Sequence, residues 1–249
     1  MSRRTRVDVL LVERGLAPSR AKAQALVLAG EVSTAGVRVD KPGQELAPDA
    51  ELVVTPRRRF VSRGGDKLDG ALAAFGARFV DLHGVVALDV GSSTGGFTDC
   101  LLTRGASKVY AVDVGYGQLD GRLREDPRVI VMERTNAKDL EVTTFAEPIV
   151  LVVVDASFIG LGKLLPSIAR VLAPGGELVA LVKPQFEAGR DAVSRGRGVI
   201  RDDAIRDAAI ARVRGEIEAA HFDVLGEIDS AVRGPKGNVE RFVHAKKRG

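Results

Sequence analysis

Small and charged residues follow several short apolar segments of this sequence, in an arrangement suited to binding a nucleotide. The apolar segment 85–90 leads into Gly91-Ser-Ser-Thr-Gly-Gly96, and glycines in such a loop let a ligand lie against main-chain N–H groups at a helix N-terminus. Asp113 follows the next apolar segment, 109–112, about as far along the chain as a ribose-binding carboxylate would be. Because the spacing is G-x-x-x-G-G and not G-x-G-x-x-G, the loop alone fits NAD, S-adenosylmethionine or a plain structural turn.

An aspartate and a lysine end two later apolar segments. Asp155 follows segment 149–154 and Lys183 follows segment 178–182. Ligands of open parallel sheets bind beyond the carboxyl ends of the strands, so we expect these two side chains to lie near each other and near the glycine loop. Each also has an ordinary interpretation, Asp155 as a helix N-cap and Lys183 as a solvent-facing strand end.

The elements that must position these residues alternate along the chain, which is typical of a doubly wound sheet. A helix through Leu68, Leu72 and Phe75 begins near Lys67 and precedes the first strand. The predicted fold class is therefore α/β, with a Rossmann-like, mostly parallel sheet of seven strands. The pattern predicts strands at 85–89, 108–112, 129–132, 149–155, 178–182, 222–228 and 241–244, and helices near 160–172 and from 202 through 217.

The first 55 residues are expected to form a separate small α+β domain. One helix ends at Gly15, and Ser19 can cap a second helix that Gly30 closes; two short alternating segments follow, 31–39 and 51–55. The segment SRAKAQALVLAGEVSTAGVRVDKPGQEL resembles the S4 RNA-binding domain. Arg20 and Lys22 lie in the first helical turn, where the helix dipole disfavours cations, so we expect them to contact phosphates more than to stabilise the fold. A protein-docking module is the alternative interpretation of this domain.

Length and composition set further limits. The 249 residues, 45% of them hydrophobic, suit one full-sized domain and one small domain. The single cysteine, Cys100, excludes an internal disulfide and is expected in the core. We expect no signal peptide, membrane span or metal site, because no apolar run is long enough and the three histidines lack ligand spacing. These features predict a cytoplasmic protein, and its arginine-rich segments favour a polyanionic partner.

Seven segments taken together resemble one family: SRGGDKL, DVGSSTGGFTD, VYAVDVGYGQL, RTNAKDL, DASFIGL, LVKPQFEAG and GPKGNVE. In this order they resemble the TlyA family of bacterial ribosomal RNA ribose 2′-O-methyltransferases, which have also been named haemolysins. The catalytic domain of that family is similar to the FtsJ-like (RrmJ) methyltransferase fold. The resemblance runs from about residue 7 to residue 243. It implies S-adenosyl-L-methionine as cofactor, ribosomal RNA or ribosomal subunits as partner, and a cytidine of 23S rRNA as target, with 16S rRNA as a second candidate.

The resemblance also implies roles for individual residues. FtsJ-like enzymes use a Lys-Asp-Lys-Glu set, which here matches Lys67, Asp155, Lys183 and Glu240. We expect Lys183 to take the proton of the ribose hydroxyl, Lys67 to orient that hydroxyl as a second cation, and the two acids to hold the ammonium groups. A lysine acts as a base only in its amine form, which burial or a second cation favours. The implied cofactor-binding residues are Asp89, Gly91, Ser92, Ser93, Thr94, Gly95, Gly96, Phe97, Asp113, Asn136 and Ala137.

The resemblance sets the domain organisation as well. It implies an S4-like domain over 1–55, a basic linker over 56–62 and an FtsJ-like domain over 63–249. The linker tetrapeptide reads Arg58-Arg-Phe-Val61, where such proteins usually have Arg-x-Trp-Val, and Ala156 replaces a more usual valine. The charge of the linker could track an RNA backbone or belong to a solvated hinge. The predicted RNA-binding residues are Arg3, Arg4, Arg6, Arg20, Lys22, Arg58 and Arg59.

Other classes of function can be weighed against the sequence. A non-catalytic RNA-binding or ribosome assembly factor would share the fold, but it would not need all four positions of the Lys-Asp-Lys-Glu set. A membrane-damaging haemolysin would need an insertion segment, and none is present. A nicotinamide dehydrogenase would leave Asp155, Lys183 and the S4-like domain without a purpose.

Overall fold

The chain divides into two compact units, Met1–Arg59 and Phe60–Gly249. We describe each unit separately, from a computed structural model that describes residues 4–55, 59–157, 159–188, 199–234 and 236–249. Two predicted RNA-binding residues, Arg3 and Arg58, lie outside the described residues.

The smaller unit packs two helices and short strands around a small apolar core. Ser19 caps the second helix as predicted, accepting a hydrogen bond from the Lys22 N–H (3.3 Å). Its core is formed by residues from both helices and the strands, including Val7, Leu11 and Val27. The helices are α1 (Val7–Glu13) and α2 (Arg20–Leu28), and the strands are β1 (Thr5–Arg6), β2 (Val32–Thr34), β3 (Val37–Arg38), β4 (Glu45–Leu46) and β5 (Val53–Val54).

The short strands of this unit pair in two small sheets. Strand β2 pairs antiparallel with β3 and with β5, within the two segments that the sequence predicted as extended. Strands β1 and β4 form a second antiparallel pair. The sequence did not predict this pair, because two residues are too few to show an alternating pattern.

The larger unit is built on one seven-stranded sheet of order β11-β12-β10-β9-β6-β7-β8. Its first five strands in the sequence are parallel, and β12 runs antiparallel to both β10 and β11. The predicted class, a mostly parallel α/β sheet of seven strands, is confirmed. The strands are β6 (Val86–Val90), β7 (Lys108–Val112), β8 (Val129–Met132), β9 (Ile149–Val154), β10 (Leu172–Val182), β11 (Phe222–Asp229) and β12 (Arg241–Lys247).

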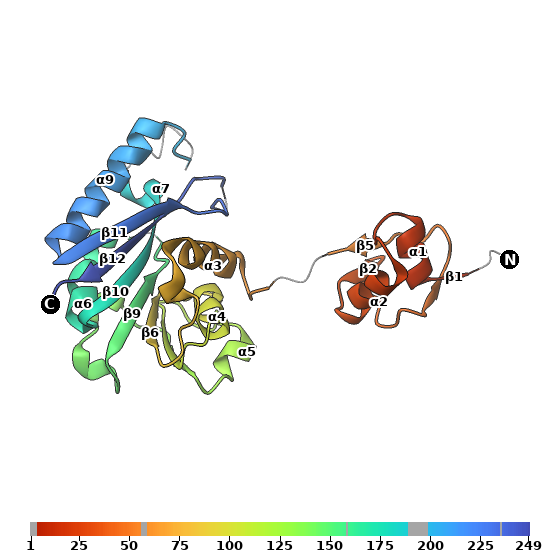
Figure 1. Ribbon diagram of the computed structural model, residues 1–249, viewed down its shortest axis with the longest axis horizontal. Helices are drawn as coiled ribbons and strands as arrows, with labels where there is room; N and C mark the ends of the chain where they lie inside the picture. The colour runs from red at the N-terminus through yellow and green to blue at the C-terminus, as the bar shows by residue number, and fades with distance from the viewer. Residues whose placement is uncertain (1–3, 56–58, 158, 189–198, 235) are drawn as a thin grey trace. The chain divides into compact units, whose positions relative to one another are not determined.

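Helices cover both faces of the sheet (Figure 1). On one face α3 and α4 form an apolar core that includes Leu68 and Phe242, and Cys100 is buried there as predicted. On the other face α6 and α9 form a second core that includes Leu165 and Val213. Because the central strands are buried on both faces, they read in the sequence as continuous apolar runs. The helices are α3 (Arg63–Phe75), α4 (Gly96–Thr103), α5 (Gly121–Arg124), α6 (Leu165–Val171), α7 (Pro184–Glu187) and α9 (Asp203–Ala219).

The structure corrects the predicted helix at 160–172. A 3₁₀ turn, η4 (Leu161–Lys163), comes first, and the α-helix starts only at Leu165, with Pro166 in its first turn. A proline has no N–H to donate and therefore fits the start of a helix but not its interior. Strand β10 is also longer than predicted, since it starts at Leu172 and has a register irregularity before Glu177.

Candidate active site

A cavity of roughly 350 Å³ lies at the carboxyl ends of β6, β7 and β9, where the sequence placed a ligand. Residues from the glycine loop, from the segment after β7 and from the segment after β9 line it. They are Val90, Gly91, Ser93, Val112, Asp113, Val114, Gly115, Gln118, Thr135, Asn136, Ala137, Asp155, Ala156, Ser157, Ile159 and Leu164. Apolar side chains thus form much of the wall, and one carboxylate, Asp113, lies on the β7 side.

Two positive-φ residues bend the glycine loop into this cavity. Gly91 (φ 85°) and Ser93 (φ 48°) both adopt left-handed backbone conformations, and the N–H groups of Gly91 and Ser92 both donate to the Val112 carbonyl (2.9 and 3.1 Å). A Cβ at position 91 would lie 2.9 Å from the Asp155 carbonyl oxygen. Glycine is therefore required there, because the loop after β6 lies directly against the loop after β9.

Asp113 is fixed at the rim of the cavity by main-chain donors. The Ser93 N–H donates to its Oδ2 (2.8 Å) and the Gly115 N–H donates to its Oδ1 (2.7 Å). Each carboxylate oxygen can accept a further hydrogen bond. Asp113 therefore presents the pair of acceptors that a ribose diol would need.

The predicted adenine-side residues also line the cavity. Asn136 and Ala137 lie on its wall, and the Asn136 Oδ1 accepts a hydrogen bond from the Lys138 N–H (3.1 Å). This bond caps the 3₁₀ turn η2 (Ala137–Asp139) and holds the wall in place.

Other residues of the predicted loop support it without lining the cavity. The Gly95 N–H donates to the Ser92 carbonyl (2.7 Å), and the Thr94 carbonyl accepts from the Asp120 N–H (3.2 Å). Gly95 (φ 93°) is also the N-cap of α4. Direct contact of these three residues with a cofactor stays a prediction.

Gly96 and Phe97 pack α4 against its neighbours, α3 and β12. A Cβ at position 96 would lie 2.8 Å from the Gly65 nitrogen, so this glycine lets α4 approach α3. Phe97 is buried, and its ring stacks on Phe242 with 5.9 Å between centroids. Neither residue lines the cavity. The predicted motif therefore also contains residues whose role is packing.

Asp89 lies beneath the loop, in β6, and its side chain is fully buried. The Thr98 hydroxyl donates to its Oδ2 (2.7 Å). Burial raises the pKa of Asp89 to about 7, against the hydrogen bond from Thr98, and the charges of Asp155 and Asp113 raise it further. Asp89 therefore does not line the cavity, but its charge interacts with those of Asp155 and Asp113, which do.

Several lining residues were missed from the sequence. Gln118 lies on the cavity wall, and its Oε1 accepts a hydrogen bond from the Ser93 hydroxyl (3.1 Å). Ser157 and Ile159 come from the loop after Asp155. The segments VYAVDVGYGQL and DASFIGL, which carry the family resemblance, contain these residues, but neither pattern indicates which side chains face the ligand.

Lys67 and Glu240 form a deeply buried ion pair. Lys67 Nζ lies 2.5 Å from Glu240 Oε2, and the side chains are 7% and 1% exposed. The Gln185 side-chain amide donates to the other Glu240 oxygen at 3.3 Å. Lys67 is thus not the ordinary surface lysine that its position alone would suggest.

Lys183 and Asp155 form a second, more open ion pair. Lys183 Nζ lies 2.6 Å from Asp155 Oδ1 and donates to the Ser157 hydroxyl (2.8 Å). The side chains are 10% and 23% exposed. Burial raises the pKa of Asp155, while the charges of Lys183 and Lys67 lower it and that of Glu240 raises it. The four residues of the predicted set therefore form one cluster, which reaches the cavity through Asp155.

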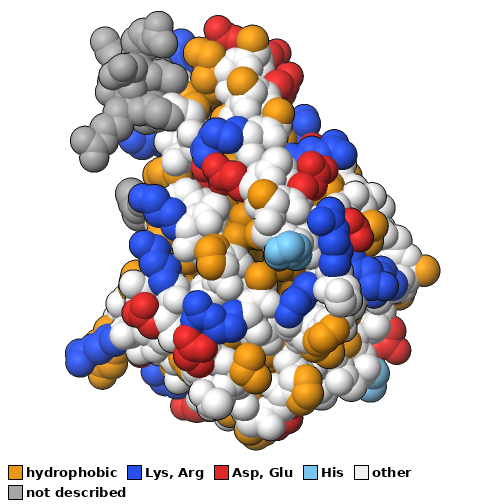
Figure 2. All heavy atoms as spheres, turned by 90° about the vertical axis from the view of Figure 1, so that its left-hand side faces the viewer, with side chains coloured by type: hydrophobic (Ala, Val, Ile, Leu, Met, Phe, Trp, Pro, Cys, Tyr) orange, Lys and Arg blue, Asp and Glu red, His pale blue; other side chains and the backbone are white. Residues whose placement is uncertain are grey.

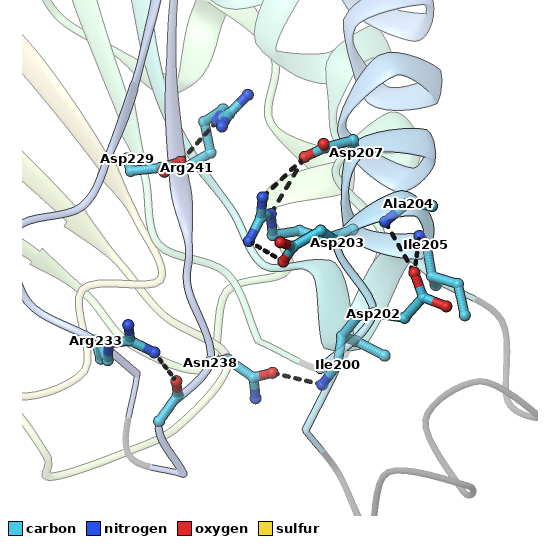
Figure 3. Close-up of polar contacts among 12 residues, drawn as sticks. Ile200, Asp202, Asp203, Ala204, Ile205, Asp207, Asp229, Arg233, Asn238 and Arg241 are labelled. Atoms are coloured by element: carbon cyan, nitrogen blue, oxygen red, sulfur yellow. Dashed lines mark hydrogen bonds and ion pairs between the residues drawn. The ribbon is translucent and has the colours of Figure 1, made fainter.

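The loop between β11 and β12 leads into Glu240. The Asn238 Oδ1 in this loop accepts a hydrogen bond from the Ile200 N–H (2.9 Å), which ties the segment before α9 to the loop (Figure 3). A Cβ at Gly234 would lie 2.6 Å from the Glu240 carboxylate. The loop backbone is therefore packed directly onto this acid.

In the smaller unit, Asp8 organises two of the predicted RNA-binding residues. Its carboxylate is fully buried and accepts bonds from Arg6 Nε and Nη2 (both 2.9 Å), Arg20 Nε (3.1 Å) and Gln24 (2.9 Å). These partners hold the pKa of Asp8 well below its usual range, with Arg6 making the largest contribution. Arg20 therefore also contributes to the fold, because its guanidinium pairs with a buried acid, and its contact with RNA phosphates stays a prediction.

Three further predicted RNA-binding residues of this unit, all among the described residues, are exposed. Arg4, Lys22 and Arg59 all present their side chains to solvent. Among the residues that the structure describes, no group of three or more potential ligand side chains is arranged to hold a metal ion. In the same residues, none of the helices has both the length and the apolar character needed to cross a bilayer.

Comparison with known proteins identifies both units. The sequence matches the FtsJ-like methyltransferase family over residues 60–247 and the S4 domain over residues 5–52. It is 44% identical over 245 residues to the 16S/23S rRNA (cytidine-2′-O)-methyltransferase TlyA of Mycobacterium tuberculosis, covering 98% of this chain and 90% of that protein. Hemolysin A of Brachyspira hyodysenteriae is 41% identical over 240 residues, covering 96% of this chain and 98% of that protein. A solved structure from Streptococcus thermophilus, also named as a hemolysin, has a TM-score of 0.74 and 41% identity, covering 100% of this chain and 90% of that one.

Proposed function

Because the chain belongs to the FtsJ-like methyltransferase family and contains an S4 domain, we propose that it methylates the ribose 2′-oxygen of a cytidine in ribosomal RNA. S-adenosylmethionine supplies the activated methyl group when it is bound. The cytidine and the ribosomal RNA come from the name of the mycobacterial relative, which acts on both 16S and 23S rRNA. We place the protein in the cytoplasm, since that is where this substrate is found.

The cavity fits S-adenosylmethionine on three observations. Asp113 offers two fixed carboxylate oxygens for a ribose diol. Ala137, Ile159 and Leu164 provide an apolar wall for an adenine ring. Gly91 leaves room where a Cβ would meet the neighbouring loop. The Asp113 carboxylate on the wall also favours a cationic ligand over a neutral one.

The observation that carries the proposal is the cluster of Lys67, Asp155, Lys183 and Glu240 beside this cavity. A ribose 2′-hydroxyl becomes a good nucleophile when a positioned group takes its proton. In this proposal Lys183, in its amine form, accepts that proton while the 2′-oxygen forms its bond to the methyl carbon. Asp155 and Ser157 hold the Lys183 nitrogen, at 2.6 and 2.8 Å. Lys67, fixed by Glu240, orients the hydroxyl.

Unpaired cations near the cluster support an RNA substrate. Arg63 lies one helical turn before Lys67, and Arg233 and Lys236 lie in the loop that leads to Glu240. All three are exposed, and within the described part of the chain none of them has an acidic partner. Exposed arginine and lysine side chains without acidic partners are suited to contact phosphates.

The test is transfer of a labelled methyl group from S-adenosylmethionine to purified large and small ribosomal subunits and to their bare rRNAs. We expect label in rRNA, recovered after digestion as 2′-O-methylcytidine. Lys183→Ala is expected to lose at least 100-fold in rate. Lys163→Ala removes an exposed lysine that follows the Asp155 loop and should keep normal rates.

Three outcomes would contradict the proposal. Label on a base instead of the ribose would exclude 2′-O-methylation. Near-normal turnover by Lys183→Ala would exclude Lys183 as the base. Absence of label from every RNA, with cofactor binding demonstrated by calorimetry, would instead favour a non-catalytic assembly factor.

A further inference from the structure

Glu187 lies at the junction of the two segments that follow Asp155 and Lys183. It is the last residue of α7, which begins directly after Lys183, and its side chain is only 4% exposed. Its Oε1 accepts a hydrogen bond from the main-chain N–H of Leu161 (2.8 Å). Leu161 begins η4, which closes the loop that starts at Asp155. One carboxylate therefore joins the segment after one member of the cluster to the segment after another.

Arg212 holds the same carboxylate from the opposite side. This α9 residue places its Nη2 2.7 Å from Glu187 Oε2, and the same nitrogen donates to the Glu187 carbonyl at 3.0 Å. Its other terminal nitrogen pairs with Glu216 on α9. Figure 2 shows the side of the molecule on which α9 lies, with acidic side chains among the lysines and arginines. Glu187 is therefore held on both oxygens, one by a main-chain donor and one by a guanidinium.

The bridged segments carry groups that contact the reacting region. The loop from Asp155 to Leu161 contributes Ser157, which accepts a hydrogen bond from Lys183, and Ile159, which lines the cavity. Gly160 packs against the bridge, since a Cβ there would lie 3.2 Å from Glu187 Oε2. A shift of Leu161 away from Glu187 would therefore move both the Ser157 hydroxyl and the cavity wall.

We propose that Glu187 is a positioning residue for methyl transfer, which sets the Asp155 loop against Lys183 through its bonds to Leu161 and Arg212. This inference rests on the proposed function of the site. The role of Glu187 is indirect, since Glu187 is not among the residues that line the cavity. Small displacements of reacting groups cost large factors in rate, so a residue that holds this loop should affect turnover more than substrate binding.

The experiment compares Glu187→Ala with Glu187→Gln. Alanine removes both bonds, whereas glutamine keeps an acceptor for the Leu161 N–H. We expect kcat to fall about 10- to 100-fold for alanine and less than about 5-fold for glutamine, with little change in KM for RNA. The pH dependence of kcat is expected to shift in the alanine variant, because the surroundings of Lys183 change. All rates are measured well below the unfolding midpoint of each variant.

Arg212→Gln provides a second route to the same bridge and leaves the bond to Leu161 in place. We expect it to lose kcat to an intermediate extent. Its matched control is Arg214→Gln on the same helix, which removes the ion pairs that the described residues show with Glu218 and Glu227 and should keep normal kinetics. If Glu187→Ala does not fold, the comparison of Glu187→Gln and Arg212→Gln with Arg214→Gln decides the question.

The inference would be overturned if the bridge variants melted at lower temperature but kept kcat within about twofold of the wild type, with an unchanged pH profile. That result would make Glu187 a purely structural ion pair. Failure of the proposed function has a different signature, since the wild-type protein itself would then transfer no methyl group to rRNA.

Discussion

Replacing Lys67 by methionine should destabilise the larger unit strongly, because it leaves the buried Glu240 carboxylate without its ion-pair partner. Glu240 is 1% exposed, and its ion pair with Lys67 spans only 2.5 Å. Among the partners that the structure describes, the carboxylate would keep the Gln185 amide at 3.3 Å in Lys67→Met. Breaking a buried pair by removing one partner costs about 3–5 kcal/mol, so we expect a loss of that size in the free energy of unfolding.

Removing the second charge should recover most of that stability. In Lys67→Met/Glu240→Gln neither charge of this pair is left, and the new amide can still bond to Gln185. We expect the double variant to lie within about 1–2 kcal/mol of the wild type, which makes it about 1–4 kcal/mol more stable than Lys67→Met. Both variants should be inactive in methyl transfer, so the second substitution should restore stability without restoring activity.

The other ion pair of the cluster gives the matched comparison. The Asp155 side chain is 23% exposed, against 1% for Glu240, although burial still raises the pKa of Asp155. We therefore expect Lys183→Met to lose less stability than Lys67→Met, although it loses the proposed base.

Urea unfolding followed by tyrosine fluorescence measures these differences in the free energy of unfolding for the larger unit of the chain. The chain has no tryptophan, and both of its tyrosines, Tyr110 and Tyr116, lie in the larger unit. The signal therefore reports the unfolding of that unit. The reasoning would be refuted if Lys67→Met were as stable as the wild type, or if the double variant were no more stable than the single one.

Three further predictions concern the region around the cavity. The raised pKa of Asp89, about 7, means that the folded state holds a proton that the unfolded state releases above about pH 4. This stabilisation is complete below pH 4 and is lost as pH rises to about 7. The free energy of unfolding of Asp89→Asn, measured in urea relative to that of the wild type, should therefore rise by on the order of 4 kcal/mol between pH 4 and pH 8. Asp113→Ala should weaken S-adenosylmethionine binding about 10- to 100-fold in calorimetry, because two acceptors for the ribose are lost; unchanged affinity would exclude that role. Gly91→Ala places a Cβ 2.9 Å from the Asp155 carbonyl oxygen, at a position with a φ of 85°. It should therefore lower the melting temperature and reduce the rate of methyl transfer at least tenfold. Normal activity would contradict the close approach of the two loops.

The sheet and its order of elements were predictable because burial leaves a pattern along the chain. Strand β9 is almost entirely buried and reads as the continuous apolar run IVLVVV, and parallel strands bring their carboxyl ends to one edge. The proximity of Asp155 and Lys183 followed from this rule. The pairing of Lys67 with Glu240 did not, since 173 residues separate them and only the family resemblance linked the two.

What the sequence could not show is how a single motif divides its residues between tasks. In the glycine loop, Gly91 and Ser93 line the cavity, whereas Gly96 and Phe97 pack α4 against its neighbours. Both groups have the same residue types and lie in one short segment. Likewise, the sequence shows Arg20 only as a cation at a helix N-terminus, where the helix dipole disfavours it. The structure shows that it pairs with Asp8, twelve residues earlier. Such contacts depend on tertiary packing and leave no periodic signal.

The unequal burial of the two ion pairs supports the proposed division of labour between the lysines. Lys67 comes from α3, and its partner Glu240 immediately precedes β12, so that pair is enclosed between elements from opposite ends of the larger unit. A proton accepted by Lys67 would have to leave through a closed core. Lys183 and Asp155 instead end adjacent strands, and the loop after Asp155 forms a wall of the cavity. Asp155 is the most exposed of the four side chains, at 23%, whereas the two lysines are only 7% and 10% exposed. A hydroxyl entering beside the cofactor would therefore meet the cluster at the pair of Asp155 and Lys183, where Lys183 in its amine form would take the proton, while Lys67, held by the enclosed Glu240, would orient the hydroxyl. The Lys183 variant should accordingly lose activity and less stability than the Lys67 variant, which should lose both.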